Sequence, residues 1–85
     1  MNNSFLLVAV YDRVSGNYGS PTIAINKATA IRDAKQNLRT SAIIEDLELY
    51  VVGGYDIRTA DIVPCKPDLI YKFADDNGVI ENENA

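Results

Sequence analysis

An unbroken run of seven apolar residues near the start of the chain predicts a buried strand. It extends from Phe5 to Tyr11 and is rich in valine, leucine and aromatic side chains. A run without polar alternation is typical of a strand covered on both faces, so we expect it at the centre of a sheet. Residues 12–21 then collect Asp, Ser, Gly, Asn and Pro, which favour a broad loop. The β-branched segment Thr22–Ile25 predicts the returning strand of a first hairpin.

The next segment has the pattern of an amphipathic helix. Asn26 is a suitable N-cap, because its side-chain oxygen can accept from a free amide of the first turn, and no Gly or Pro interrupts residues 27–39. We therefore expect a helix over residues 27–39. Its apolar positions fall on one narrow stripe that suits packing on a sheet, namely Ile31, Ala34 and Leu38.

A second hairpin is predicted after the helix. Between residues 47 and 55 two sets of side chains alternate, and the face that we expect to be buried carries Leu47, Leu49, Val51 and Tyr55. The Gly53-Gly54 pair within this strand predicts a bulge or a close approach of another backbone. Residues 56–61 supply the turn, and Ile62–Cys65 the short return strand.

The chain becomes less regular after this point. Pro64 and Pro67 cannot donate to a ladder of hydrogen bonds, so their segment is expected at a sheet edge or outside the sheet. Leu69–Phe73 either adds an edge strand or packs across a partner subunit. Residues from Asp75 onward are acidic with little to bury, and they predict a mobile tail. The tail serves solubility or, alternatively, masks the basic helix by imitating the charge of DNA.

Both long strands run into a Tyr-Asp pair, at Tyr11-Asp12 and at Tyr55-Asp56. An Asp side chain can accept from backbone amides two residues further on and so start a turn. We therefore interpret these aspartates as structural rather than as a catalytic pair.

Together the elements predict an α+β fold. A small antiparallel sheet of two β-hairpins has the order β-β-α-β-β, with an extra C-terminal edge strand as an option, and one helix covers one face. Residues 1–74 form a single α+β domain and residues 75–85 the acidic, disordered tail. A chain of 85 residues has one modest core. Because Cys65 is its one cysteine, no internal disulfide can stabilise it, so we expect a homodimer.

Composition argues against catalysis. The chain has no histidine and one cysteine, which leaves no zinc cluster, no Cys-His pair and no imidazole-dependent triad. Its glycines match no phosphate-binding motif. We therefore expect no catalytic residue, no cofactor and no metal. One unpaired thiol and the lack of a long apolar stretch favour a cytoplasmic protein that is not inserted in a membrane.

Charge is distributed unevenly along the chain, whose net charge is -4. Residues 26–44 carry four cations and one acid, whereas residues 45–85 carry ten acids and three cations. Helical spacing brings Arg32, Lys35 and Arg39 onto one flank of the apolar stripe. Single-strand binders combine such cations with aromatic rings on which bases stack. The predicted nucleic-acid contacts are therefore Lys27, Arg32, Lys35 and Arg39 for phosphates, and Tyr18 and Tyr50 for bases. Alternatively, the basic flank is a solvated face that pairs with the acidic tail.

Several short motifs, in this order, resemble the small nonstructural protein of gokushoviruses, which are Microviridae phages with single-stranded DNA genomes. They are Tyr11-Asp12, then Tyr18-Gly19-Ser20-Pro21, then Asn26 with Ala30-Ile31-Arg32, and finally residues 46–56 (DLELYVVGGYD). The resemblance covers roughly residues 5 to 65 and implies a nonstructural phage protein of the infected bacterial cytoplasm, linked to making or packaging the genome. It implies no defined set of binding residues.

Two hypotheses follow. In the first, the protein associates with single-stranded DNA in phage genome replication or packaging. In the second, it is an adaptor that contacts a phage or host protein through a sheet edge or the acidic tail.

Overall fold

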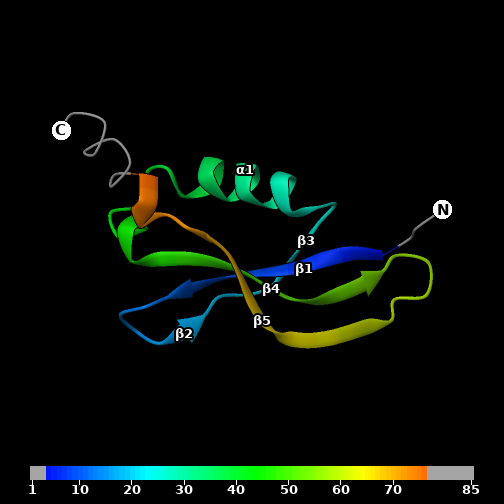
Figure 1. The fold of residues 1–85 in the computed structure, drawn as a ribbon. Coiled ribbons are helices and arrows are strands. Elements are labelled where there is room, and N and C mark those ends of the chain that lie inside the picture. The colour runs from blue at the N-terminus through cyan, green and yellow to red at the C-terminus, as the bar shows by residue number, and fades with distance from the viewer. Residues whose placement is uncertain (1–3, 77–85) are drawn as a thin grey trace.

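Two antiparallel hairpins form a five-stranded sheet, and one helix connects them (Figure 1). The structure is a computed structural model that describes residues 4–76. Its elements are β1 (Ser4–Asp12), β2 (Asn17–Tyr18), β3 (Thr22–Ala24), α1 (Lys27–Leu38), the 3-10 helix η1 (Ile44–Asp46), β4 (Leu47–Asp56) and β5 (Ile62–Lys72). The strand order is β2-β1-β4-β5, with β3 also paired to β1. The predicted α+β fold, with one helix over one face of the sheet, is confirmed.

β1 lies at the centre of the sheet, as its apolar sequence predicts. It pairs with β4 along one side and with β2 and β3 along the other. The expectation that both its faces are buried is correct only at Val8 and Ala9, and the other residues of the run are half-buried. The reason is that α1 covers one face, while no helix of residues 4–76 covers the other (Figure 1).

The core lies between α1 and the face of the sheet below it. Leu49 and Phe73 are the most completely buried large side chains, at 1% and 2% exposure. The predicted helix stripe packs against this core through Ile31, Ala34 and Leu38, and Leu47 and Val51 are buried as expected.

Tyr55 does not share the buried face of β4, so its predicted burial there is wrong. The β1–β4 register shifts between Val51 and Gly53, which moves the later residues of β4 by one position. Tyr55 then pairs with Phe5 on the helix-free face, where it is half-buried. The predicted irregularity at the paired glycines is confirmed by this shift.

The second hairpin ends in one long strand rather than two short ones. β5 runs from Ile62 to Lys72 and forms the outer edge beside β4. Val51 pairs with Asp68, whereas Gly53 pairs with Pro64. The segment of β5 between Pro64 and Asp68 is therefore longer than the segment of β4 opposite it, and the register shifts to accommodate the difference. The edge position predicted from the prolines is confirmed, and the optional C-terminal strand is the second half of β5.

Side chains close the turns as predicted. The Asn26 Oδ1 accepts from the Thr29 amide at 2.8 Å and caps α1. The Asp12 Oδ1 accepts from the amide of residue 14 at 2.9 Å, and the Asp56 Oδ1 from that of residue 58 at 2.8 Å. Both aspartates therefore act as turn initiators. Within residues 4–76 no helix is long and apolar enough to cross a membrane.

The first two residues of the predicted tail lie next to the domain. Asp75 and Asp76 are in a helical turn in which the Asp76 amide donates to the Phe73 carbonyl at 3.2 Å. The rest of the predicted tail, residues 77–85, lies outside the described residues, as do residues 1–3.

The two glycines of β4 are expected to respond differently to alanine. A Cβ at position 53 would lie 2.7 Å from the Val63 carbonyl oxygen, so Gly53→Ala should force β4 and β5 apart and cost about 1 to 3 kcal/mol, as overpacking does. A Cβ at position 54 meets nothing closer than the Phe5 carbonyl oxygen at 3.7 Å, so Gly54→Ala is the matched control. Urea unfolding measures both, and equal midpoints for the two variants would contradict this prediction.

Candidate functional site

Three tyrosines meet on the sheet face opposite α1. Tyr11 and Tyr18 are directly paired across β1 and β2. Val10 and Leu49, the neighbours of Tyr11 and Tyr50 along their strands, pack in the core under α1, and successive side chains of a strand point to opposite faces. Ring centroids are 4.6 Å apart for Tyr11 and Tyr18, 5.7 Å for Tyr11 and Tyr50, and 5.5 Å for Tyr18 and Tyr50. This tyrosine cluster presents Tyr18, 44% exposed, to solvent.

A buried carboxylate holds one member of the tyrosine cluster in place. Glu48 is 9% exposed, and its Oε1 accepts from the Tyr50 hydroxyl at 3.0 Å. The hydrogen bond to Glu48, aided by desolvation, raises the pKa of Tyr50 above its ordinary value of 10.0. The Arg13 Nε lies 3.7 Å from the other carboxylate oxygen of Glu48. Tyr50 is therefore fixed through its hydroxyl, which leaves Tyr18 as the member best placed to contact a ligand.

Arg13 connects the first hairpin to the segment before β4. Its Nη2 donates to the Glu45 carbonyl at 2.9 Å and lies 3.5 Å from the Asp46 carboxylate. The Arg13 amide also donates to the Asp46 carbonyl at 3.0 Å. The turn that carries β2 and Tyr18 is thus tied to η1 by three contacts.

The helix cations predicted to contact phosphates are exposed, and several lie near carboxylates of the same chain. The Lys27 Nζ is 4.0 Å from the Asp68 carboxylate of β5, and the Arg32 Nε is 3.2 Å from the adjacent Asp33. Arg39, at the C-cap of α1, has no ion pair with any of residues 4–76. Exposed ion pairs of this kind contribute about 0 to 1 kcal/mol to stability, so another anion can replace the carboxylate beside each cation.

Lys35 has a more specific environment than the other helix cations. Its Nζ lies 4.6 Å above the ring centroid of Tyr71 and 3.8 Å from the Asp76 Oδ1. The Tyr71 hydroxyl donates to the same Asp76 oxygen. The contact with the Tyr71 hydroxyl, followed by the attraction of Asp76, raises the pKa of Lys35. Burial, followed by the bond to Asp76, raises the pKa of Tyr71. The alternative prediction, that the basic flank pairs with the acidic tail, is therefore confirmed at one position, the Lys35–Asp76 ion pair.

The predicted site residues fall into two areas rather than one. Tyr18 and Tyr50 lie on the helix-free face, whereas the four cations lie on α1, on the opposite side of the sheet. The C-terminal end of α1, the start of β4, the end of β5 and the β1–β2 turn all lie toward the same end of the sheet (Figure 1). The C-terminal part of α1 and the strands that carry the tyrosine cluster therefore reach the same end of the sheet.

Two site residues escape the sequence prediction, Tyr11 and Tyr71. Tyr11 closes an apolar run that shows no alternation, so its face cannot be inferred from periodicity. Tyr71 faces Lys35 because β5 continues through its prolines, which the sequence predicts to be interrupted. The spacing of Tyr71 and Phe73 is the signal that places Tyr71 on the same side as the buried Phe73. Leu69, which has the same parity, pairs instead with Tyr50 on the helix-free face, because the register shifts between the two pairs.

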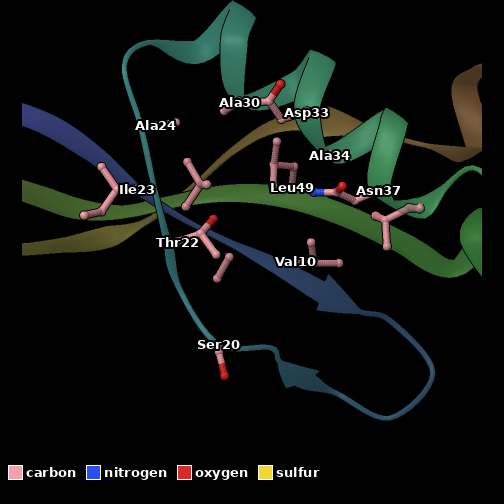
Figure 2. A pocket seen from close by; sticks show the side chains of 13 residues that line it. Val10, Ser20, Thr22, Ile23, Ala24, Ala30, Asp33, Ala34, Asn37 and Leu49 are labelled. Atoms are coloured by element: carbon pink, nitrogen blue, oxygen red, sulfur yellow. The ribbon is translucent and has the colours of Figure 1, made fainter.

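A cavity of about 290 Å³ lies between α1 and strands β1 and β3. Its walls are mostly apolar, with Asn37 contributed by α1 and Val10, Thr22 and Leu49 contributed by strands of the sheet (Figure 2). None of the predicted contact residues lines it. Within residues 4–76 no group of three or more His, Cys, Asp or Glu side chains is placed to hold a metal ion.

The Tyr50 contact predicts a change in titration. Glu48→Gln should lower the pKa of Tyr50 toward 10.0, because a neutral amide stabilises the protonated hydroxyl less than a carboxylate does. Because the pKa of Tyr50 is higher in the folded protein than in the unfolded chain, the hydrogen bond stabilises the folded protein fully below pH 10.0. This stabilisation disappears as the pH rises through the folded-state pKa. Tyrosine ring NMR follows the titration. Asp68→Asn, on the other face, should leave it unchanged, and an unaltered Tyr50 in Glu48→Gln would refute the assignment.

A known protein family matches almost all of the described chain. Residues 5–76 match the model of the family described as Phage ORF5 protein. No curated protein and no solved structure matches the chain. The matched segment contains α1, the tyrosine cluster and all of β5. The chain therefore belongs to the phage ORF5 protein family.

Proposed function

We propose that this phage protein is a non-catalytic accessory that associates with single-stranded DNA during genome replication or packaging. The observation that supports this most is the tyrosine cluster on a sheet face that α1 leaves open. We also place the chain among the small nonstructural proteins of gokushoviruses, because the order of its motifs resembles theirs.

The tyrosine cluster has the features of a base-stacking surface. An open sheet face with clustered aromatic rings is one of the recurring ways in which proteins bind unpaired bases. Tyr11 and Tyr50 pack edge to face at an interplanar angle of 79°, and Glu48 fixes the Tyr50 hydroxyl. Tyr18 rests on both rings and remains 44% exposed, so a base can stack on its outer surface. Such stacking tolerates any sequence, because every base has a π face.

The cations of α1 provide a second contact area for the phosphates. Their carboxylate partners are exposed and contribute little, so a polyanion can displace them. The net charge of -4 opposes general coating of DNA and favours a modest, salt-sensitive affinity. Stacking therefore has to supply much of the binding energy.

Tyr18 is expected to dominate this affinity. Tyr18→Ala should weaken binding to a fluorescently labelled oligothymidylate by about 1 to 3 kcal/mol, about a 5- to 150-fold rise in Kd. Tyr18→Phe keeps the ring and should bind within about twofold of the original protein. Fluorescence anisotropy measures all three proteins. Equal weakening by Phe and Ala would show that the ring does not stack.

The helix cations are expected to set the salt dependence. Arg32→Ala/Lys35→Ala/Arg39→Ala should reduce the slope of log K against log salt by about 2, because each phosphate that a cation neutralises on a single strand contributes about 0.7 to this slope. Arg58→Ala removes a cation from the β4–β5 turn and serves as the control with an unchanged slope. An identical slope in the triple variant would exclude α1 from the interface with DNA.

A protein-interaction adaptor is the second candidate, and one observation favours it. Residues 62–69 on the outer strand β5 are all exposed, including the apolar Ile62, Val63 and Leu69. Failure of the protein to bind either single-stranded or duplex DNA at low salt would leave this candidate. The homodimer expected from the length of the chain stays a prediction.

A further inference from the structure

Two donors on fixed elements converge on a single carboxylate oxygen. The Tyr71 hydroxyl donates to the Asp76 Oδ1, and the Lys35 Nζ lies 3.8 Å from that oxygen. Tyr71 is held by its pairing with Leu49 across β4 and β5 and by an edge contact with Phe73, whose ring centroid is 5.2 Å away. α1 fixes the backbone of Lys35, and its Nζ lies 4.6 Å from the centroid of the Tyr71 ring. The donors are therefore preorganised for one anionic oxygen.

The carboxylate that fills this place is less firmly held than the donors. Asp76 lies beyond the last strand, in the helical turn that follows Phe73. Its side chain is 43% exposed and that of Lys35 is 46% exposed. Exposed ion pairs are weak because water competes for both charges. A second anion can thus reach Lys35 and Tyr71 from solvent and replace Asp76.

A phosphate oxygen suits the same donors. An ammonium and a hydroxyl both bind phosphate oxygens through charge-assisted hydrogen bonds, as they bind carboxylates. We propose that Lys35 and Tyr71 form a binding site for a backbone phosphate of single-stranded DNA, and that Asp76 occupies this site in the free protein as an internal competitor. This inference rests on the proposed function and adds a regulated contact to it.

The position of the site agrees with a strand that also reaches the tyrosine cluster. Lys72 follows Tyr71 in the chain and pairs with Glu48, which lies beside the tyrosine cluster. Consecutive side chains of β5 point to opposite faces, so Tyr71 faces α1 while Lys72 faces the cluster. A flexible single strand that leaves Lys35 and Tyr71 would therefore bend around the end of β5 past Lys72, reach Tyr50 on β4 first, and then cross β1 to Tyr18 on β2.

The test compares two neighbouring acids. Asp76→Asn removes the competing charge, whereas Asp75→Asn removes the same charge from an adjacent exposed position for which the structure shows no side-chain partner among residues 4–76. Binding of labelled oligothymidylate by fluorescence anisotropy at low salt should be about three- to tenfold tighter for Asp76→Asn than for Asp75→Asn, the gain expected from releasing one ion pair with its charged hydrogen bond. Thermal unfolding checks that both variants are folded.

A second variant isolates the donor. Tyr71→Phe added to Asp76→Asn keeps the ring under Lys35 and removes only the hydroxyl, so it should abolish most of the gain. Equal affinities for the two single asparagine variants, with the original protein binding, would overturn the internal competitor and leave the proposed function intact. Absence of binding by every protein, the original included, would overturn the proposed function and this inference with it.

Discussion

The pairing of β1 with β4 is the contact on which both faces of the sheet depend. Its register sets Val8 opposite Val51 and Val10 opposite Leu49, and these residues make the floor of the core beneath α1. The same register turns the tyrosine cluster to the other face. Because side chains alternate along a strand, a slip of one residue would put Tyr50 under the helix and Leu49 in water. The core and the tyrosine cluster are thus placed by one set of backbone hydrogen bonds.

The sequence predicts the elements whose signals are local. The N-cap at Asn26, the turns at Asp12 and Asp56 and the apolar stripe of α1 each depend on residues a few positions apart, and the structure confirms them. Elements that depend on long-range pairing are predicted less well. β2 is two residues long and owes its existence to β1, and β5 continues past its prolines because the register shift against β4 absorbs the irregular stretch.

The candidate site shows the same division. Residue types alone predict that the helix cations and Tyr18 are exposed, and the structure confirms this. Whether they share a face depends on strand register, which is a property of the whole sheet. Tyr11 and Tyr71 can be assigned to the two areas only when that register is known. Asp76 lies near Lys35 only because of the helical turn that follows β5. Composition thus identifies the candidate residues, whereas the topology of the sheet determines which of them are in contact.

The outer strand has a further consequence for behaviour in solution. Pro64 and Pro67 lack amide donors, and Lys66 between them adds charge to the same border. Strand borders with these features resist open-ended stacking of one copy on the next, the step that begins fibril growth. Although much of β5 is uncovered, its sequence therefore disfavours fibril growth through that border.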